Sequence, residues 1–188
     1  MKKAIIFWSI CIVIIAYNLT IFFVGNRIKM QPVFKFYDDE CIERLYSEAD
    51  YYKEYTEDKK IIRDRVNKEF NNPLYIYIGK DTRTLYNGAV GYAIIPLRII
   101  CVAERMSYTN YIWCLVHEII HLQYVTCNET FTNFMTFKIL YESSNFDFKQ
   151  VAISFGLDYM NAWDDDNEEY NIGYYVHQYL EEIGCKTG

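Results

Sequence analysis

Apolar residues recur at three- and four-residue steps between positions 38 and 70, and polar residues occupy the opposite face. This spacing predicts amphipathic helix, with Ile62, Val66 and Phe70 on its buried side. The helical pattern stops at Asn71-Asn72-Pro73, because a proline disfavours helical backbone in the residue before it. We expect this segment to pack on, or lead into, the domain that follows.

The pattern changes after position 73 to short runs that are rich in β-branched and aromatic residues. Gly88, Gly91 and Pro96 separate these runs, as glycine and proline commonly do between strands. Strands are expected at residues 74–78, 84–86, 90–95 and 97–102. The sequence thus predicts a small sheet in the middle of the chain.

Helical periodicity returns in the second half of the chain. Ser107 or Thr109 can cap the start of a helix that runs to about Tyr124. Three further helices are expected, at residues 128–141, 148–160 and 168–183. The predicted fold class is therefore α+β, with a small sheet followed by helices.

The start of the chain has yet another pattern, because residues 4–24 carry no charge. About 21 such residues in a helix cover roughly 30 Å, the thickness of the hydrocarbon core of a bilayer. A cleaved signal peptide normally has a shorter apolar region that ends in small residues at the cleavage site. The sequence therefore predicts an uncleaved transmembrane helix and a single-pass membrane protein.

The predicted organisation has three parts. Residues 1–29 form the membrane anchor, residues 30–72 the amphipathic helical segment, and residues 73–188 the main domain. Basic residues flank the apolar segment almost equally on both sides, so they do not decide its orientation. The acidic character of the remaining chain favours a main domain outside the cytoplasm.

Composition and charge exclude two classes of protein. Half of the residues are hydrophobic (52%), which supplies a core and excludes a chain that is disordered throughout. The net charge of −6 and the lack of a basic run exclude nucleic acid as a partner. The six cysteines include no Cys-x-x-Cys pair, so neither a zinc ribbon nor a thioredoxin-like redox pair is indicated.

The strongest chemical signal is His117-Glu118-Ile119-Ile120-His121, which contains two of the three histidines. Residues four apart share one helix face, so both imidazoles can bind one zinc ion. Glu118 would then lie beside the open coordination position and act as the general base. The motif therefore predicts metal ligands at His117 and His121 and a catalytic residue at Glu118.

A catalytic zinc ion usually has three protein ligands. If the motif helix ends near Tyr124, Glu129 begins a returning helix and comes level with His121. Glu129 is therefore the predicted third ligand. Glu142, at the far end of the same helix, is the reserve candidate, and an aspartate or His177 is the remaining alternative.

These residues resemble those of the gluzincin metallopeptidases, in which the third ligand is a glutamate on a following helix. Asn128-Glu129-x-x-x-Asn133 is similar to the Asn-Glu-x-x-x-Asp segment of the thermolysin-like branch. Two other segments look like the aminopeptidase branch: residues 87–92 occupy the place of its Gly-Ala-Met-Glu-Asn strand, and Tyr170-Asn171-Ile172-Gly173 is similar to its Tyr-Glu-Lys-Gly helix. The resemblance implies a zincin-like domain with a small sheet packed on an active-site helix.

The departures from the family limit what the resemblance implies. Residues 87–92 lack the glutamate that binds a substrate's amino terminus, so exopeptidase action is not implied. The interval between His121 and Glu129 is shorter than in either branch and resembles small, membrane-associated zincin-like domains. The resemblance covers residues 74–184, and only its His-Glu-x-x-His part is specific.

The predicted function is zinc-dependent, endopeptidase-like hydrolysis of peptide bonds in a peptide or protein substrate. The resemblance makes Tyr170 the donor that stabilises the oxyanion, with Tyr174 and His177 as alternatives. One of the strands at 90–95 and 97–102 could pair with an extended substrate. The competing hypothesis is a membrane-anchored interaction or immunity protein with a structural or inactive zinc site, and a third is a zinc hydrolase of other amides.

Overall fold

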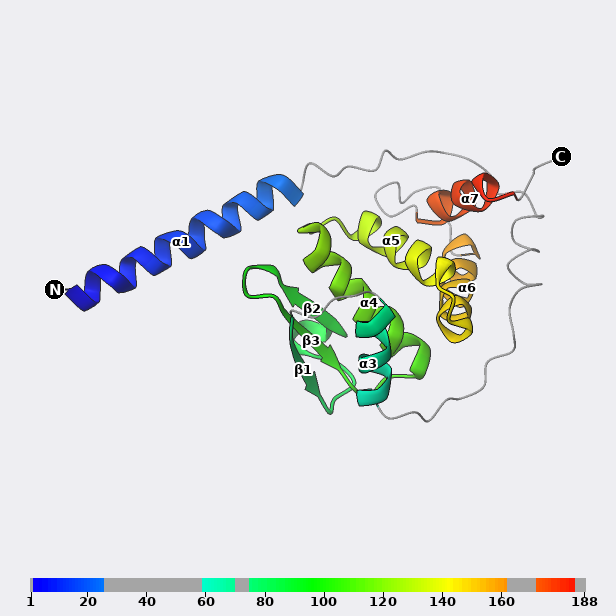
Figure 1. Ribbon diagram of the computed structural model, residues 1–188, viewed down its shortest axis with the longest axis horizontal. Coiled ribbons are helices and arrows are strands. Elements are labelled where there is room, and N and C mark those ends of the chain that lie inside the picture. The colour runs from blue at the N-terminus through cyan, green and yellow to red at the C-terminus, as the bar shows by residue number, and fades with distance from the viewer. Residues whose placement is uncertain (1, 26–58, 70–74, 162–171, 185–188) are drawn as a thin grey trace.

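The computed structural model of the protein describes residues 2–25, 59–69, 75–161 and 172–184 (Figure 1). The fold is α+β, as predicted, with a three-stranded sheet and a group of helices. The elements are α1 (Lys2–Gly25), α3 (Lys59–Glu69), β1 (Ile76–Lys80), η1 (Tyr86–Gly88), β2 (Gly91–Ile94), η2 (Ile95–Leu97), β3 (Ile99–Ala103), α4 (Tyr108–Tyr124), α5 (Glu129–Glu142), α6 (Phe146–Asn161) and α7 (Ile172–Glu182).

The sheet has the strand order β1-β3-β2, so among the described strands β2 lies at an edge. β1 runs parallel to β3, with Ile76 opposite Ile99. β2 runs antiparallel to β3, with Gly91 opposite Val102. Three of the predicted strands are confirmed, with bounds shifted by one or two residues.

The strand predicted at residues 84–86 is wrong. Residues 84 and 85 belong to no strand or helix, and Tyr86 begins the 3-10 turn η1. Asn87 and Gly88 both have positive φ, at 59° and 79°, a backbone conformation that these two residue types adopt more readily than others. The Asn-Gly pair therefore turns the chain where the β-branched and aromatic residues around it indicated a strand.

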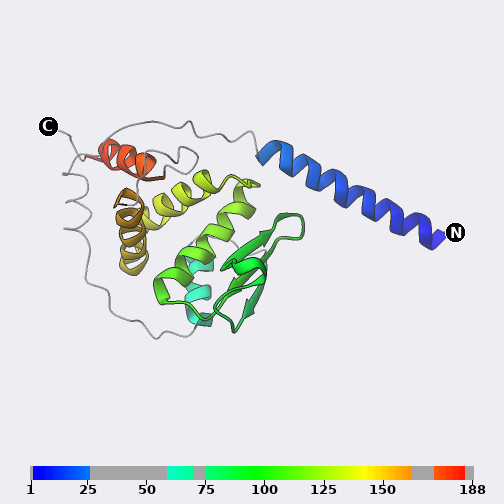
Figure 2. The same cartoon turned by 180° about the vertical axis from the view of Figure 1, so that it is seen from behind.

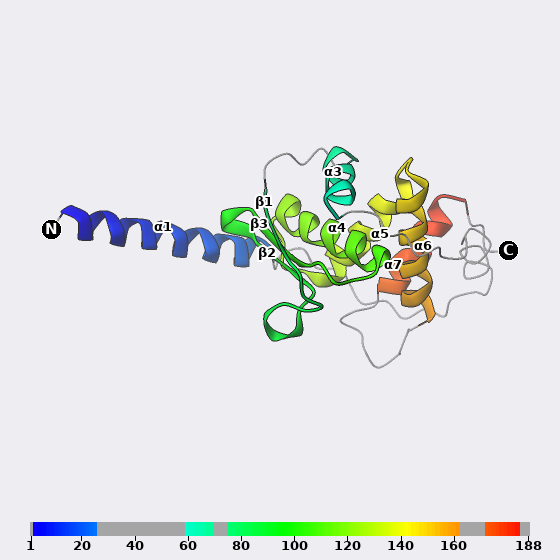
Figure 3. The same ribbon diagram turned by 90° about the horizontal axis from the view of Figure 1, so that it is seen from below.

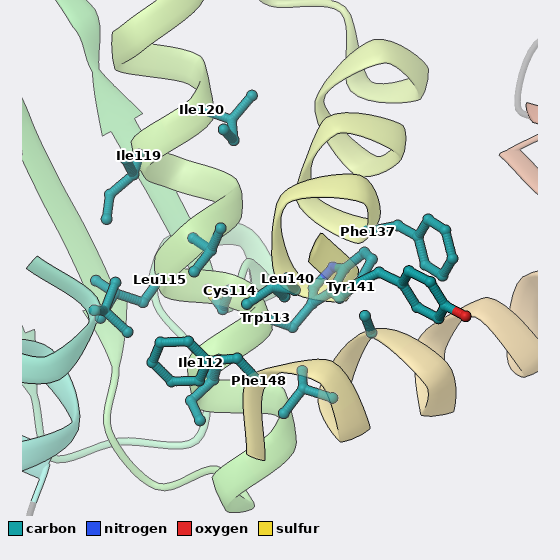
Figure 4. Packing of buried hydrophobic residues seen from close by; sticks show 14 of the residues in the cluster. Ile112, Trp113, Cys114, Leu115, Ile119, Ile120, Phe137, Leu140, Tyr141 and Phe148 are labelled. Atoms are coloured by element: carbon teal, nitrogen blue, oxygen red, sulfur yellow. The ribbon is translucent and has the colours of Figure 1, made fainter. Parts of the chain in front are cut away.

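Helix α4 is the centre of the domain and lies between the sheet and the pair α5–α6 (Figures 1 and 3). Its apolar residues are buried on several faces, as expected of a helix that is covered on several sides. Ile112, Leu115 and Ile119 are fully buried and meet Leu140 and Phe148 of the neighbouring helices in one core cluster (Figure 4). This core holds the middle of α4 in a fixed position relative to β2 and α5.

The remaining predicted helices are present where the structure describes them, whereas residues 38–58 of the helical segment predicted at 38–70 lie outside the described residues. α3 buries Ile62 and Val66 completely and packs on α4, whereas Phe70 lies outside the described residues. α5 and α6 match their predicted ranges within two residues. The beginning of the predicted helix at 168–183 also lies outside the described residues, and α7 covers the part that is described.

Residues 4–24, which were predicted to be helical, lie in α1. Figures 1 and 2 show this helix extending away from the domain. Phe7, Trp8 and Val13 are each more than half exposed. Over the part of the chain that the structure describes, no helix combines the length and the apolar character needed to cross a membrane. The α+β part of the fold prediction is thus confirmed, and its transmembrane helix is not.

Candidate metal centre

The helix that carries the motif has a side-chain cap at its start and a sharp turn at its end. Ser107 caps α4, because its hydroxyl accepts a hydrogen bond from the backbone N–H of Asn110. Val125 ends the helix in the left-handed conformation, with φ 51° and ψ 48°. Its backbone N–H donates to the carbonyl of His121, and the chain turns back toward the motif.

The returning helix starts at the predicted third ligand. Asn128 caps α5 by accepting a hydrogen bond of 2.8 Å from the backbone N–H of Phe131. Glu129 is therefore the first residue of α5. A carboxylate in the first turn is favourable, because the positive end of the helix dipole lies there. The same position brings Glu129 beside the two histidines.

Three side chains converge at this point. The Nε2 atoms of His117 and His121 lie 3.0 Å apart. Oε2 of Glu129 lies 3.1 Å from Nε2 of His117, and Oε1 lies 3.4 Å from Nε2 of His121. Within the described ranges, these residues form a group whose possible ligand atoms all lie within 4.8 Å of one another.

The group has the chemistry and the dimensions of a zinc site. Two imidazole nitrogens and a carboxylate oxygen are common ligands of catalytic zinc. With zinc–ligand bonds of about 2.0–2.1 Å in a tetrahedron, neighbouring ligand atoms are about 3.3 Å apart. The distance of 3.0 Å between the two Nε2 atoms is close to that value, and each Nε2 has a carboxylate oxygen of Glu129 at a similar distance, Oε2 at 3.1 Å and Oε1 at 3.4 Å. The residues therefore fit the metal that the motif implies.

The ring of His121 is held by its other nitrogen. Nδ1 lies 2.8 Å from the backbone carbonyl of Thr126 and 3.4 Å from the hydroxyl of Thr132. The Thr132 hydroxyl itself donates to the carbonyl of Asn128, at 2.8 Å. Since a carbonyl oxygen only accepts, Nδ1 carries the proton and Nε2 presents its lone pair to the metal position.

Sequence reasoning missed these two threonines. Thr126 lies in the turn after α4, and Thr132 lies three residues after Glu129 on α5. For Thr132 the available signal was its helical spacing from Glu129, since residues three apart share one face of a helix. Asn133, which the resemblance matched to an aspartate, lines a larger cavity beside the motif.

The charges of the group support one another. Burial alone would raise the pKa of Glu129, but hydrogen bonds from His117 and His121, which donate from Nε2 when their rings are protonated, outweigh it and lower that pKa well below its usual range. Burial alone would lower the pKa of His121, but its hydrogen bond and attraction to Glu129 outweigh it and raise that pKa. The ionised carboxylate therefore favours a positive charge between these side chains.

Glu118, the predicted general base, is almost completely buried, with 5% of its surface exposed. Burial raises the pKa of its carboxyl, and the nearby histidines only partly offset that effect. Strand β2 passes directly over it at Gly91. A Cβ atom on Gly91 would lie 2.8 Å from Oε1 of Glu118 and 2.5 Å from Sγ of Cys114. Glycine thus allows the strand to approach the carboxylate closely.

Gly91→Ala is expected to destabilise the protein by about 1–3 kcal/mol, the usual cost of forcing extra atoms into a packed site. Urea unfolding of the full-length chain measures this effect. Adding Cys114→Ala should restore part of the loss, because it removes the atom nearest to the new methyl group. Equal stability of Gly91→Ala and wild type would show that β2 does not lie so close to Glu118.

Two cavities open beside the motif. The smaller has a volume of about 240 Å³, and Glu129, His121 and residues 91–93 of β2 are among the residues that line it. The larger has a volume of about 620 Å³ and extends along α4. Gly91, His117 and Glu118 line both. The converging side chains are therefore accessible from a cleft that extends to both sides of Gly91, His117 and Glu118.

The other sequence candidates do not join this group. Glu142 accepts a hydrogen bond of 2.9 Å from the hydroxyl of Tyr179 at the opposite end of α5, about 20 Å along the helix from Glu129. His177 lies on α7, which packs on α5 and α6, with Nδ1 3.9 Å from Glu181. Tyr174 lies on α7 as well.

The predicted oxyanion donor, Tyr170, lies outside the described residues. Tyr159, on α6, is a tyrosine near the metal group. Burial raises the pKa of its hydroxyl first, and the charges of Asp158 and Glu129 raise it further. It was not singled out in the sequence, because nothing there relates α6 to the motif.

Comparison of the chain with protein-family models, with curated proteins and with solved structures finds no match. The function must therefore be argued from the chain's own residues. Those residues are His117, His121 and Glu129, together with the buried Glu118 and the adjoining cleft.

Proposed function

We propose that the protein is a zinc-dependent peptide hydrolase of the gluzincin type that cleaves within its substrates. The observation that carries this proposal is the convergence of His117, His121 and Glu129 from two helices, with one possible ligand atom from each residue lying within 4.8 Å of the others. A purely structural zinc site has no need of a general base. The buried Glu118 next to this group therefore favours an enzyme over an interaction protein.

His117, His121 and Glu129 would hold the metal. When bound, zinc would supply a Lewis acid and lower the pKa of a water molecule toward about 7. Glu118 takes a proton from the attacking water and later delivers it to the leaving amine. The hydrogen bond between His121 and Thr126 keeps the imidazole in the orientation and tautomer that this chemistry needs.

The edge strand β2 gives the substrate a place to bind. Its residues 91–93 line the cavity that contains Glu118 and Glu129. A strand at the edge of a sheet has backbone groups available to pair with an extended peptide. Such pairing would run a peptide backbone past Glu118, as cleavage within a chain requires. Tyr170 remains the proposed oxyanion donor, on the resemblance alone.

The proposal is tested by peptide digestion. Full-length protein supplied with zinc is incubated with a mixture of unstructured peptides, and products are identified by mass spectrometry. Cleavage should disappear on chelation and return when zinc is restored. Zinc binding without cleavage of any peptide would instead favour the interaction or immunity protein with an inactive zinc site.

We further propose that α1 attaches the protein to a membrane, with the main domain outside the cytoplasm. The support is the exposure of its apolar side chains, since large exposed apolar surfaces commonly mark interaction sites. The full-length chain should fractionate with membranes and resist carbonate extraction, and deletion of residues 2–25 should release it. Recovery of a soluble, amino-terminally trimmed protein would show that the segment is a signal peptide.

A further inference from the structure

The larger cavity follows one face of α4 away from the metal group. It is lined by Asn110, Trp113 and His117, which recur at helical spacing. The seven positions from Asn110 to His117 correspond to about 10 Å along the helix axis. Its volume of about 620 Å³ exceeds the needs of one side chain and suits several residues of a peptide.

The part of this cavity next to the motif is apolar and aromatic. Trp113 stacks on Phe155 of α6, with ring centroids 4.1 Å apart and an angle of 17° between the planes. Trp113 is 6% exposed, so the stack is a fixed surface within the core. Both residues line the cavity together with His117. A large apolar side chain would be desolvated there, beside the metal group.

The far end of the cavity carries positive charge. Arg105 lines it but is neutralised by Asp81, with Nε–Oδ1 and Nη2–Oδ2 distances of 2.8 and 3.1 Å. Arg83 lines the same end, since the carbonyl of its neighbour Thr82 accepts a hydrogen bond from the backbone N–H of Arg105. Among the residues that the structure describes, Arg83 has no acidic partner. This end of the cavity therefore has one net positive charge.

We infer that this cavity selects the substrate: it takes a large apolar side chain at the cleaved bond and an acidic side chain about three residues away. An extended peptide advances about 3.3 Å per residue, so about three residues span the roughly 10 Å from His117 to Asn110, toward the end of the cavity that Arg83 lines. This inference rests on the proposed function, since it places the cleaved bond of the substrate beside Glu118. Arg83 then acts as a specificity residue.

Peptide binding tests the inference. The probes are labelled Gly/Ser/Ala peptides with a central Phe and a Glu three residues to either side. Matched probes carry Gln in place of both Glu residues or Ser in place of Phe. Fluorescence anisotropy measures their affinities for full-length Glu118→Gln protein supplied with zinc. The Glu probe should bind about three- to fivefold more tightly than the Gln probe at low salt.

Arg83→Gln should abolish the preference for Glu without weakening the binding of the Gln probe. Lys80→Gln is the matched control, because Lys80 is exposed on the neighbouring β1 and lines neither cavity. It should keep the preference. The Ser probe should bind more weakly than the Phe probe to all of these proteins.

The inference is overturned if the Glu118→Gln protein, with Arg83 and Lys80 unchanged, binds the Glu and Gln probes with equal affinity. It is also overturned if Lys80→Gln loses as much of the preference for Glu as Arg83→Gln does. If the protein with Glu118 intact cleaves peptides but shows no such preference, the proposed function stands and the inference fails. If it cleaves none while the preference that depends on Arg83 persists, the inference about binding stands and the proposed function fails.

Discussion

Glu118→Gln is expected to lower peptide hydrolysis by about a hundred- to ten-thousandfold while zinc content stays at about one ion per chain. Glutamine keeps the size and polarity of the side chain but cannot accept a proton from the attacking water. It does not remove any of the three converging side chains, so metal retention should be unchanged. Product formation and elemental analysis on the same preparation measure both quantities.

The folded state should tolerate this change. Burial raises the pKa of Glu118, so its ionised form is disfavoured in the metal-free folded protein. The free energy of unfolding therefore falls as the pH rises from the ordinary pKa of a glutamate through the raised pKa of the folded state. At neutral pH the neutral glutamine should therefore not lower the melting temperature of metal-free protein. Glu142→Gln is the control, since Glu142 lies at the other end of α5 and should be fully active. Full activity of Glu118→Gln would remove the peptidase mechanism and favour the binding-protein hypothesis.

Glu129→Ala is expected to weaken zinc binding by at least about a hundredfold and to lower hydrolysis with it. The carboxylate lies 3.1 and 3.4 Å from the two histidine nitrogens, so its removal leaves a site with two protein ligands. Loss of a residue that only orients a ligand typically costs ten- to a hundredfold in affinity. Loss of a ligand itself should cost more. Competition with a chromogenic chelator measures the affinity.

Glu142→Ala separates the two ligand assignments made from the sequence. Glu142 is engaged by Tyr179 and does not join the converging group, so this variant should bind zinc as wild type does. If Glu129→Ala kept its zinc and activity while Glu142→Ala lost both, the assignment of Glu129 as the third ligand would be wrong. The turn between α4 and α5 would then differ from the one described.

The parts of the site that sequence reasoning could predict are local. His117 and His121 share a face because their spacing matches one helical turn, and α4 keeps that spacing. Glu129 followed from the length of the turn after Tyr124, because a short connection returns the chain beside the helix that it leaves. The structure brings these three residues together by that route.

The parts that could not be predicted depend on contacts between distant segments. The position of β2 against Glu118 is set by Gly91, whose missing Cβ matters only once the strand meets α4. The stack of Trp113 on Phe155 requires α6 to lie against α4, and no periodicity indicates which helices are neighbours. At Asn87 and Gly88, turn chemistry outweighed the β propensity of the residues around them.

The central claim is that His117, His121 and Glu129 hold a zinc ion. Full-length protein, purified without chelator and then supplied with zinc and desalted, tests it most directly by elemental analysis. The predicted result is about one zinc ion per chain. A protein that remains folded and holds no metal after zinc has been supplied would contradict the claim, and the proposed function with it.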